Sequence, residues 1–70
     1  MKIIYTLHAI DQIKERMIEK IWVEETIGFP DRLKKCGAKH YASKKLNGHT
    51  LKVIYVKEKY IKVITSFFIK

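Results

Sequence analysis

The apolar residues of this sequence change their spacing at Pro30, and this change constrains the fold more than any other feature. Before Pro30 they recur every three or four residues, as on one side of a helix. The phase of that repeat shifts between Met17 and Ile18. We therefore expect two short helices, over about residues 7–16 and 20–28, the second ending at Gly28-Phe29-Pro30.

After Pro30 the pattern becomes one of alternation and of β-branched and aromatic residues, which is typical of strands. Strands are expected over about residues 32–36, 39–46, 50–57 and 60–68. Asn47-Gly48 predicts a two-residue hairpin turn, because both residues tolerate positive φ. If Glu58-Lys59 is a second two-residue turn, three polar residues lie abreast on one face of the sheet: Ser43, Lys52 and Thr65.

These elements predict a single α+β domain over residues 1–70. Two short N-terminal helices would pack on a four-stranded antiparallel sheet, and Lys2 to Tyr5 could add a short N-terminal strand. Apolar residues occur on both faces of the expected sheet, so the pattern leaves open which face the helices cover.

Charge is distributed unevenly along the chain, which has 15 Lys and Arg against 7 Asp and Glu and a net charge of +8. All but four of the basic residues, and only one acid, Glu58, follow residue 31. So basic a segment attracts a polyanion by counterion release, and RNA is the partner we expect. The residues expected to contact phosphate are Lys34, Lys35, Lys44, Lys45 and Lys52. A solvated lysine-rich surface would have the same composition.

The sequence gives no sign of a membrane, metal or cofactor. No apolar run approaches the roughly 18 residues of a membrane helix, and no Cys/His spacing or glycine-rich loop resembles a zinc or phosphate site. Cys36 is the only cysteine, so no internal disulfide can form, which is typical of a reducing compartment. We expect a cytoplasmic protein in which Cys36 is a small buried hydrophobe.

Metal-free cleavage of RNA is a chemistry that these residues allow. It needs a base for the 2′-hydroxyl, an acid for the leaving 5′-oxygen and cations for the phosphate. His8 lies in the first turn of the expected first helix, where the helix dipole disfavours a charged imidazole, and a neutral imidazole can accept a proton. His8 could equally be a structural residue of that turn. His40 and His49 are weaker candidates.

Several short segments, in order, resemble an uncharacterised bacterial and archaeal family with the pattern His-Ala-x-x-Arg-x-x-x-Arg-Gly-Ile, followed by an acidic helix that ends in Pro. In this chain they are His8-Ala9, Arg16, Ile18, Val23-Glu24-Glu25, Ile27 to Pro30, Leu51 to Tyr55 and Val63-Ile64-Thr65. The resemblance covers roughly residues 5–68. Gln12 replaces an arginine of the pattern, Met17 replaces the glycine between the helices, and Lys52 stands where arginine is common.

That family is placed in the RelE-like group, whose fold has N-terminal helices on a four-stranded antiparallel sheet. Many members are metal-independent ribonucleases that act as toxins and pair with a small antitoxin. The resemblance implies that His8 is the general base or acid, that Arg16 and Lys52 bind phosphate, that Thr65 supports them and that Tyr55 is a second acid. A small acidic antitoxin is then the expected protein partner. A non-catalytic nucleic-acid-binding module and a basic domain that docks an acidic protein are the alternatives, and the sequence leaves the oligomeric state open.

Overall fold

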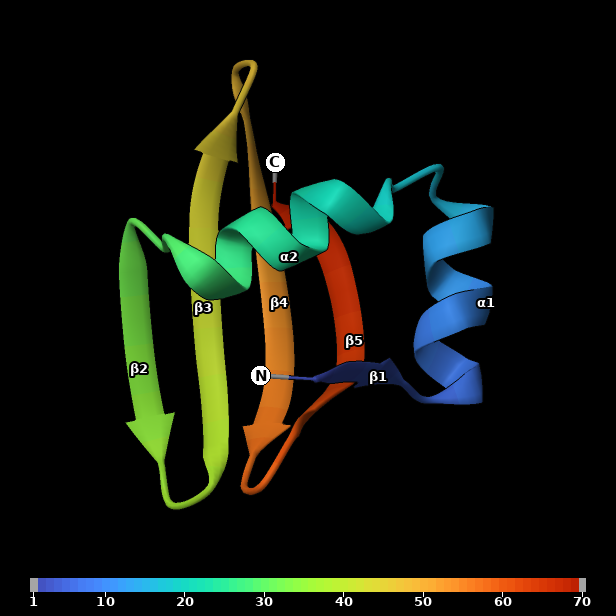
Figure 1. Cartoon of the computed structure of the whole chain (residues 1–70). Helices are drawn as coiled ribbons and strands as arrows, with labels where there is room; N and C mark the ends of the chain where they lie inside the picture. Colours follow the sequence, from blue (N-terminus) through green and yellow to red (C-terminus); the bar gives the residue numbers. More distant parts are fainter. Residues whose placement is uncertain (1, 70) are drawn as a thin grey trace.

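The computed structural model describes residues 2–69, and it contains two helices and a five-stranded sheet (Figure 1). The α+β class is confirmed. The elements, in chain order, are β1 (Ile3–Tyr5), α1 (Leu7–Glu15), α2 (Lys20–Gly28), β2 (Arg32–Cys36), β3 (Lys39–Leu46), β4 (His49–Lys57) and β5 (Ile61–Ile69). In the described part of the chain, neither helix is long and apolar enough to cross a membrane.

The sheet differs from the four-stranded antiparallel sheet that was expected. Its strand order is β1-β5-β4-β3-β2, and β1 pairs with β5 in parallel, so the sheet is mixed. The pairing is extended at both ends by backbone bonds, from the Thr6 amide to the Val63 carbonyl and from the Ile61 amide to the Lys2 carbonyl. A parallel partner cannot come from a tight turn, and here the chain returns to β1 only after both helices and three strands.

Helix α1 has clear signals at both ends. The Thr6 hydroxyl accepts a hydrogen bond from the Ala9 amide at 3.0 Å, which makes Thr6 a side-chain N-cap. At the other end the Ile18 amide donates to the Ile13 carbonyl at 2.9 Å and the Met17 amide to the Lys14 carbonyl at 3.3 Å. This is a Schellman motif, and Met17 occupies its left-handed position with a φ of 54°. The shift of apolar phase at Met17 is therefore a capped helix end.

The helices cover only one face of the sheet. Helix α2 crosses that face over β3 and β4, while α1 stands beside β5 (Figure 1). The core between them is formed by buried residues of both helices, of the segment that joins them and of β3, β4 and β5: Ala9, Ile13, Ile18, Val23, Ala42, Leu51, Val53, Tyr55, Ile61 and Val63. Among residues 2–69, no helix packs on the other face, which we call the open face.

The two hairpins of β3, β4 and β5 have different turns. Asn47-Gly48 forms the expected two-residue turn, with Leu46 opposite His49. The second turn is one residue longer than expected, because Lys57 pairs with Ile61.

A β-bulge in β5 then compensates for the longer turn. Tyr55 pairs with Val63 and Ile54 with Thr65, so that Ile64 has no cross-strand partner. Without the bulge the longer turn would send Thr65 into the core. With it, Thr65 reaches the open face, but Lys52 lies opposite Phe67 rather than Thr65, which corrects the predicted row.

Candidate functional site

One side of α1 carries a line of polar residues along the edge of β5. His8, Gln12 and Arg16 follow one another at four-residue intervals, so their side chains lie on one side of the helix. Ala9 and Ile13, one position further on, face the core. The predicted residues His8 and Arg16 therefore belong to the same surface, and Gln12 lies between them.

Gln12 connects His8 to Thr65. Its amide nitrogen Nε2 lies 2.9 Å from His8 Nε2, and its Oε1 accepts a hydrogen bond from Thr65 Oγ1. Because Oε1 is used by the hydroxyl, the amide group is the donor toward His8. The imidazole Nε2 is then the acceptor, and the proton of a neutral ring lies on Nδ1.

The position of these hydrogen-bonded side chains follows from the bulge in β5. Thr6, the N-cap of α1, donates its hydroxyl proton to the carbonyl of Ile64, the bulged residue, at 3.4 Å. The start of the helix is thereby attached to the strand immediately beside Thr65. His8 lies one residue into the helix, which explains why it comes close to this part of β5.

Arg16 reaches the next part of β5. Its Nη1 donates to the Ser66 carbonyl at 2.9 Å, and its Cζ lies 6.0 Å from the centre of the Phe67 ring. Phe67 pairs across strands with Lys52. Arg16 therefore lies beside Phe67, and Lys52 is the cross-strand neighbour of the same residue.

The structure thus brings His8, Arg16 and Thr65 together at the junction of α1 and β5. Lys52 lies one strand away on the open face, diagonal to Thr65, a separation that a long side chain can span. The Lys52 ammonium itself lies 5.8 Å from the centre of the Tyr41 ring on β3.

Tyr55, by contrast, lies outside this group. It is 3% exposed on the helix-covered face, with its ring stacked on His40 at a centroid distance of 5.1 Å. Burial raises the pKa of the Tyr55 hydroxyl, which makes it a poorer proton donor. His40 is buried as well, and its Nδ1 lies 2.9 Å from the Ala38 carbonyl. Both residues belong to the core, so neither takes part in chemistry at the open face.

The five lysines expected to bind phosphate are divided between the two faces. Lys34 and Lys52 line a pocket on the open face, and alternation along β3 places Lys45 on that face too. Lys35 and Lys44 lie on the other side. The Lys44 ammonium donates to the Phe29 carbonyl at 2.9 Å, where it stabilises the C-terminal end of α2.

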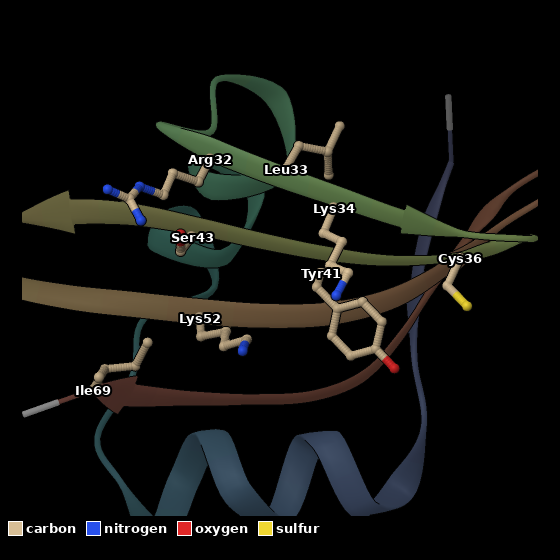
Figure 2. Close-up of a pocket in the computed structure, with 8 residues that line it drawn as sticks. All are labelled: Arg32, Leu33, Lys34, Cys36, Tyr41, Ser43, Lys52 and Ile69. Carbon is tan, nitrogen blue, oxygen red and sulfur yellow. The ribbon is translucent and has the colours of Figure 1, made fainter.

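The pocket on the open face has a volume of ≈ 680 Å³ and spans β2 to β5. Figure 2 shows side chains of all four strands standing on this face, among them Arg32, Lys34, Tyr41, Ser43, Lys52 and Ile69. None of these strands contains an aspartate or glutamate. The strands of this face are therefore cationic. Asp31, just before β2, lies at one end of the face, where its Oδ2 accepts a hydrogen bond from the Lys45 amide at 2.8 Å.

Cys36 corrects another expectation. It lies at the end of the edge strand β2 and is exposed rather than buried. Cys36 lines the basic pocket, and its cross-strand neighbour is Lys39. Within residues 2–69 there is also no cluster of three or more His, Cys, Asp or Glu residues placed to hold a metal ion.

Three residues of the site were missed by the sequence analysis: Gln12, Tyr41 and Phe67. Gln12 had a readable signal, because it lies four residues from both His8 and Arg16. Phe67 had no such signal in the sequence, because its position depends on the bulge.

The chain matches no protein-family model, no curated protein and no solved structure.

Proposed function

We propose that this protein is a metal-independent endoribonuclease of the RelE-like type, which binds single-stranded RNA on the open face and cleaves it where α1 meets β5. The observation that carries the proposal is the hydrogen-bonded chain from His8 through Gln12 to Thr65, which ends at the basic open face of the sheet. The resemblance of the short segments to a RelE-like family supports the same function.

In this proposal His8 is the general base. Its Nε2 lone pair, which accepts from Gln12 in the free protein, takes the proton of the 2′-hydroxyl as that oxygen attacks phosphorus. Arg16 and Lys52 stabilise the additional negative charge on the phosphate, and Thr65 holds Gln12 in place. The P–O5′ bond breaks, leaving a 2′,3′-cyclic phosphate and a 5′-hydroxyl. The protonated imidazole then donates a proton to the leaving 5′-oxygen.

The test is cleavage of an end-labelled single-stranded RNA in the presence of EDTA. We expect the wild type to produce 2′,3′-cyclic phosphate ends, and a substrate with 2′-deoxyribose throughout to resist cleavage. His8→Ala should lower the rate by about 10²–10⁴-fold, the usual contribution of a general acid or base. His49→Ala is the matched control, because His49 is also an exposed histidine but lies at the Asn47-Gly48 turn.

Absence of cleavage, or equal loss in both histidine variants, would refute the catalytic proposal. A second function, binding of RNA without cleavage, is favoured by a separate observation: the basic pocket on the open face is lined by Arg32, Lys34 and Lys52 and not by His8. Binding that persists without any cleavage of RNA would establish that function instead.

A toxin of this type would act in the cytoplasm and be neutralised by a small acidic antitoxin. The basic open face is the surface that such a protein would cover. An adjacent reading frame that encodes a small acidic protein, and loss of RNA binding when the two proteins are mixed, are the expected results. An unaffected RNA affinity in the mixture would argue against this partner.

A further inference from the structure

Tyr41 is the aromatic residue at the centre of the open face. It lies in the middle of β3, half-buried, between Lys34 on β2 and Ile54 on β4. Figure 2 shows its ring beside the end of the Lys34 side chain and over β4. The site proposed for cleavage, at the edge of β5, does not use this ring.

Cations surround the ring. The Lys39 ammonium lies 5.5 Å from the ring centre and the Lys52 ammonium 5.8 Å, while Lys34 is its cross-strand neighbour. Exposed cation–π contacts of this kind are weak, because water solvates the ammonium well. An unpaired base stacked on the same ring would contribute more, and the displaced lysines would remain close enough to meet its phosphates.

We propose that Tyr41 is a stacking platform for one unpaired nucleobase of a single-stranded RNA, held there by phosphate contacts to Lys34, Lys39 and Lys52. The inference rests on the RNA binding proposed above but not on cleavage. It implies that the face selects single strands, because a base inside a duplex cannot expose its ring surface to Tyr41.

The position of Tyr41 supports this geometry. Thr65 and Tyr41 flank the same β4 residue, Ile54, from either side, so that Tyr41, Ile54 and Thr65 form one cross-strand row. A strand of RNA laid along this row would place its stacked base on β3 and a phosphate at β5. The stacking site is thus two strands away from Thr65, and Lys52 on β4 lies between the two.

The experiment compares two polyanions, a labelled single-stranded oligoribonucleotide and an inorganic polyphosphate of similar length, which has no bases. Affinities are measured by fluorescence anisotropy, with polyphosphate as a competitor, for the wild type, Tyr41→Ala, Tyr41→Phe and Tyr60→Ala. Tyr60 is a control because it is a partly exposed tyrosine in the turn between β4 and β5. Thermal melting checks that each variant is folded.

We expect Tyr41→Ala to weaken RNA binding by about 5- to 150-fold, equivalent to about 1–3 kcal/mol for loss of one stacked base. Its affinity for polyphosphate should stay within about 2-fold, and Tyr41→Phe and Tyr60→Ala should bind RNA as the wild type does. The salt dependence should be unchanged in Tyr41→Ala, whereas Lys52→Ala should lower the slope by about one phosphate contact.

An equal loss for RNA and polyphosphate in Tyr41→Ala would overturn the inference, since the ring would then act only by arranging the lysines. No loss for RNA would overturn it as well. In both cases wild-type binding of RNA would leave the proposed function standing. A wild type that binds no RNA at low salt would remove both proposals together.

Discussion

Replacing Met17 with glycine is expected to stabilise the protein. Met17 occupies the left-handed position of the Schellman motif that ends α1, with a φ of 54°, and its side chain is 83% exposed. The apolar contact of the motif is made by its neighbours Ile13 and Ile18, which are both buried. The Met17 side chain therefore contributes little packing, while its Cβ is held in a conformation that L-residues disfavour.

The magnitude follows from two opposing effects. A residue with a Cβ in the left-handed region costs about 1–2 kcal/mol, which glycine avoids. Glycine loses more chain entropy on folding, about 0.5–1 kcal/mol relative to alanine. We expect a net gain of about 0.5–1 kcal/mol in the free energy of unfolding. For a domain of this size that corresponds to a rise in Tm of about 2–8 °C.

The assay is thermal and urea denaturation of Met17→Gly, with Met17→Ala as the control. Alanine removes the exposed side chain but keeps the Cβ, so it should change the free energy of unfolding by less than about 0.5 kcal/mol. A Met17→Gly variant less stable than the wild type would refute this reasoning. So would a Met17→Ala variant that is stabilised as much, because the gain would then come from removing an exposed apolar side chain.

Three further predictions concern stability. Leu51→Ala should lower the free energy of unfolding by about 2–5 kcal/mol in urea denaturation, because Leu51 is fully buried and its loss leaves a cavity. Gly48→Ala should lower it by about 1 kcal/mol in the same assay, because Gly48 has a φ of 82° in the hairpin turn. Burial and the neighbouring Glu24 carboxylate raise the pKa of the Tyr5 hydroxyl from 10.0 to about 12. The protonated hydroxyl therefore contributes its full stabilisation of the folded state below pH 10, and this contribution is lost as the pH rises through about 12. In an ultraviolet absorbance titration, Tyr5→Phe should remove the tyrosine ionisation that occurs at the highest pH. Glu24→Gln should lower the pKa of Tyr5, but not as far as 10.0, because the effect of burial remains. An unchanged titration curve in both variants would contradict the assignment.

The elements that local signals encode were predictable from the sequence. The two helices, and the hairpin at Asn47-Gly48, each have a cap, a phase shift or a turn dipeptide within a few residues. The pairing of the N-terminal strand was harder to predict, since Ile3–Tyr5 is short and pairs with residues 61–63 near the other end of the chain. Such a pairing is decided by tertiary packing, and nothing in the local sequence identifies the partner.

The register of the last strand was not predictable for a related reason. Glu58-Lys59 contains neither Gly nor Asn and so specifies no two-residue turn type. The bulge at Ile64 has no sequence signature either. The face of the sheet on which Tyr55 lies could, however, have been predicted from the sequence. It is three residues from Lys52 in one strand, and alternation alone places two such residues on opposite faces.

The two sides of the molecule differ in charge in a way that net charge conceals. Alternation sends Lys35 and Lys44 to the helix-covered side, so the open face holds only part of the basic excess. The acids, however, lie on the helices or in connecting segments and never in β2 to β5: Asp11, Glu15, Glu19, Glu24, Glu25, Asp31 and Glu58. A polyanion is thus attracted more strongly to the open face than to the helix-covered side, which favours an approach with the open face toward it. Along that face, the row from Tyr41 to Thr65 leads to His8.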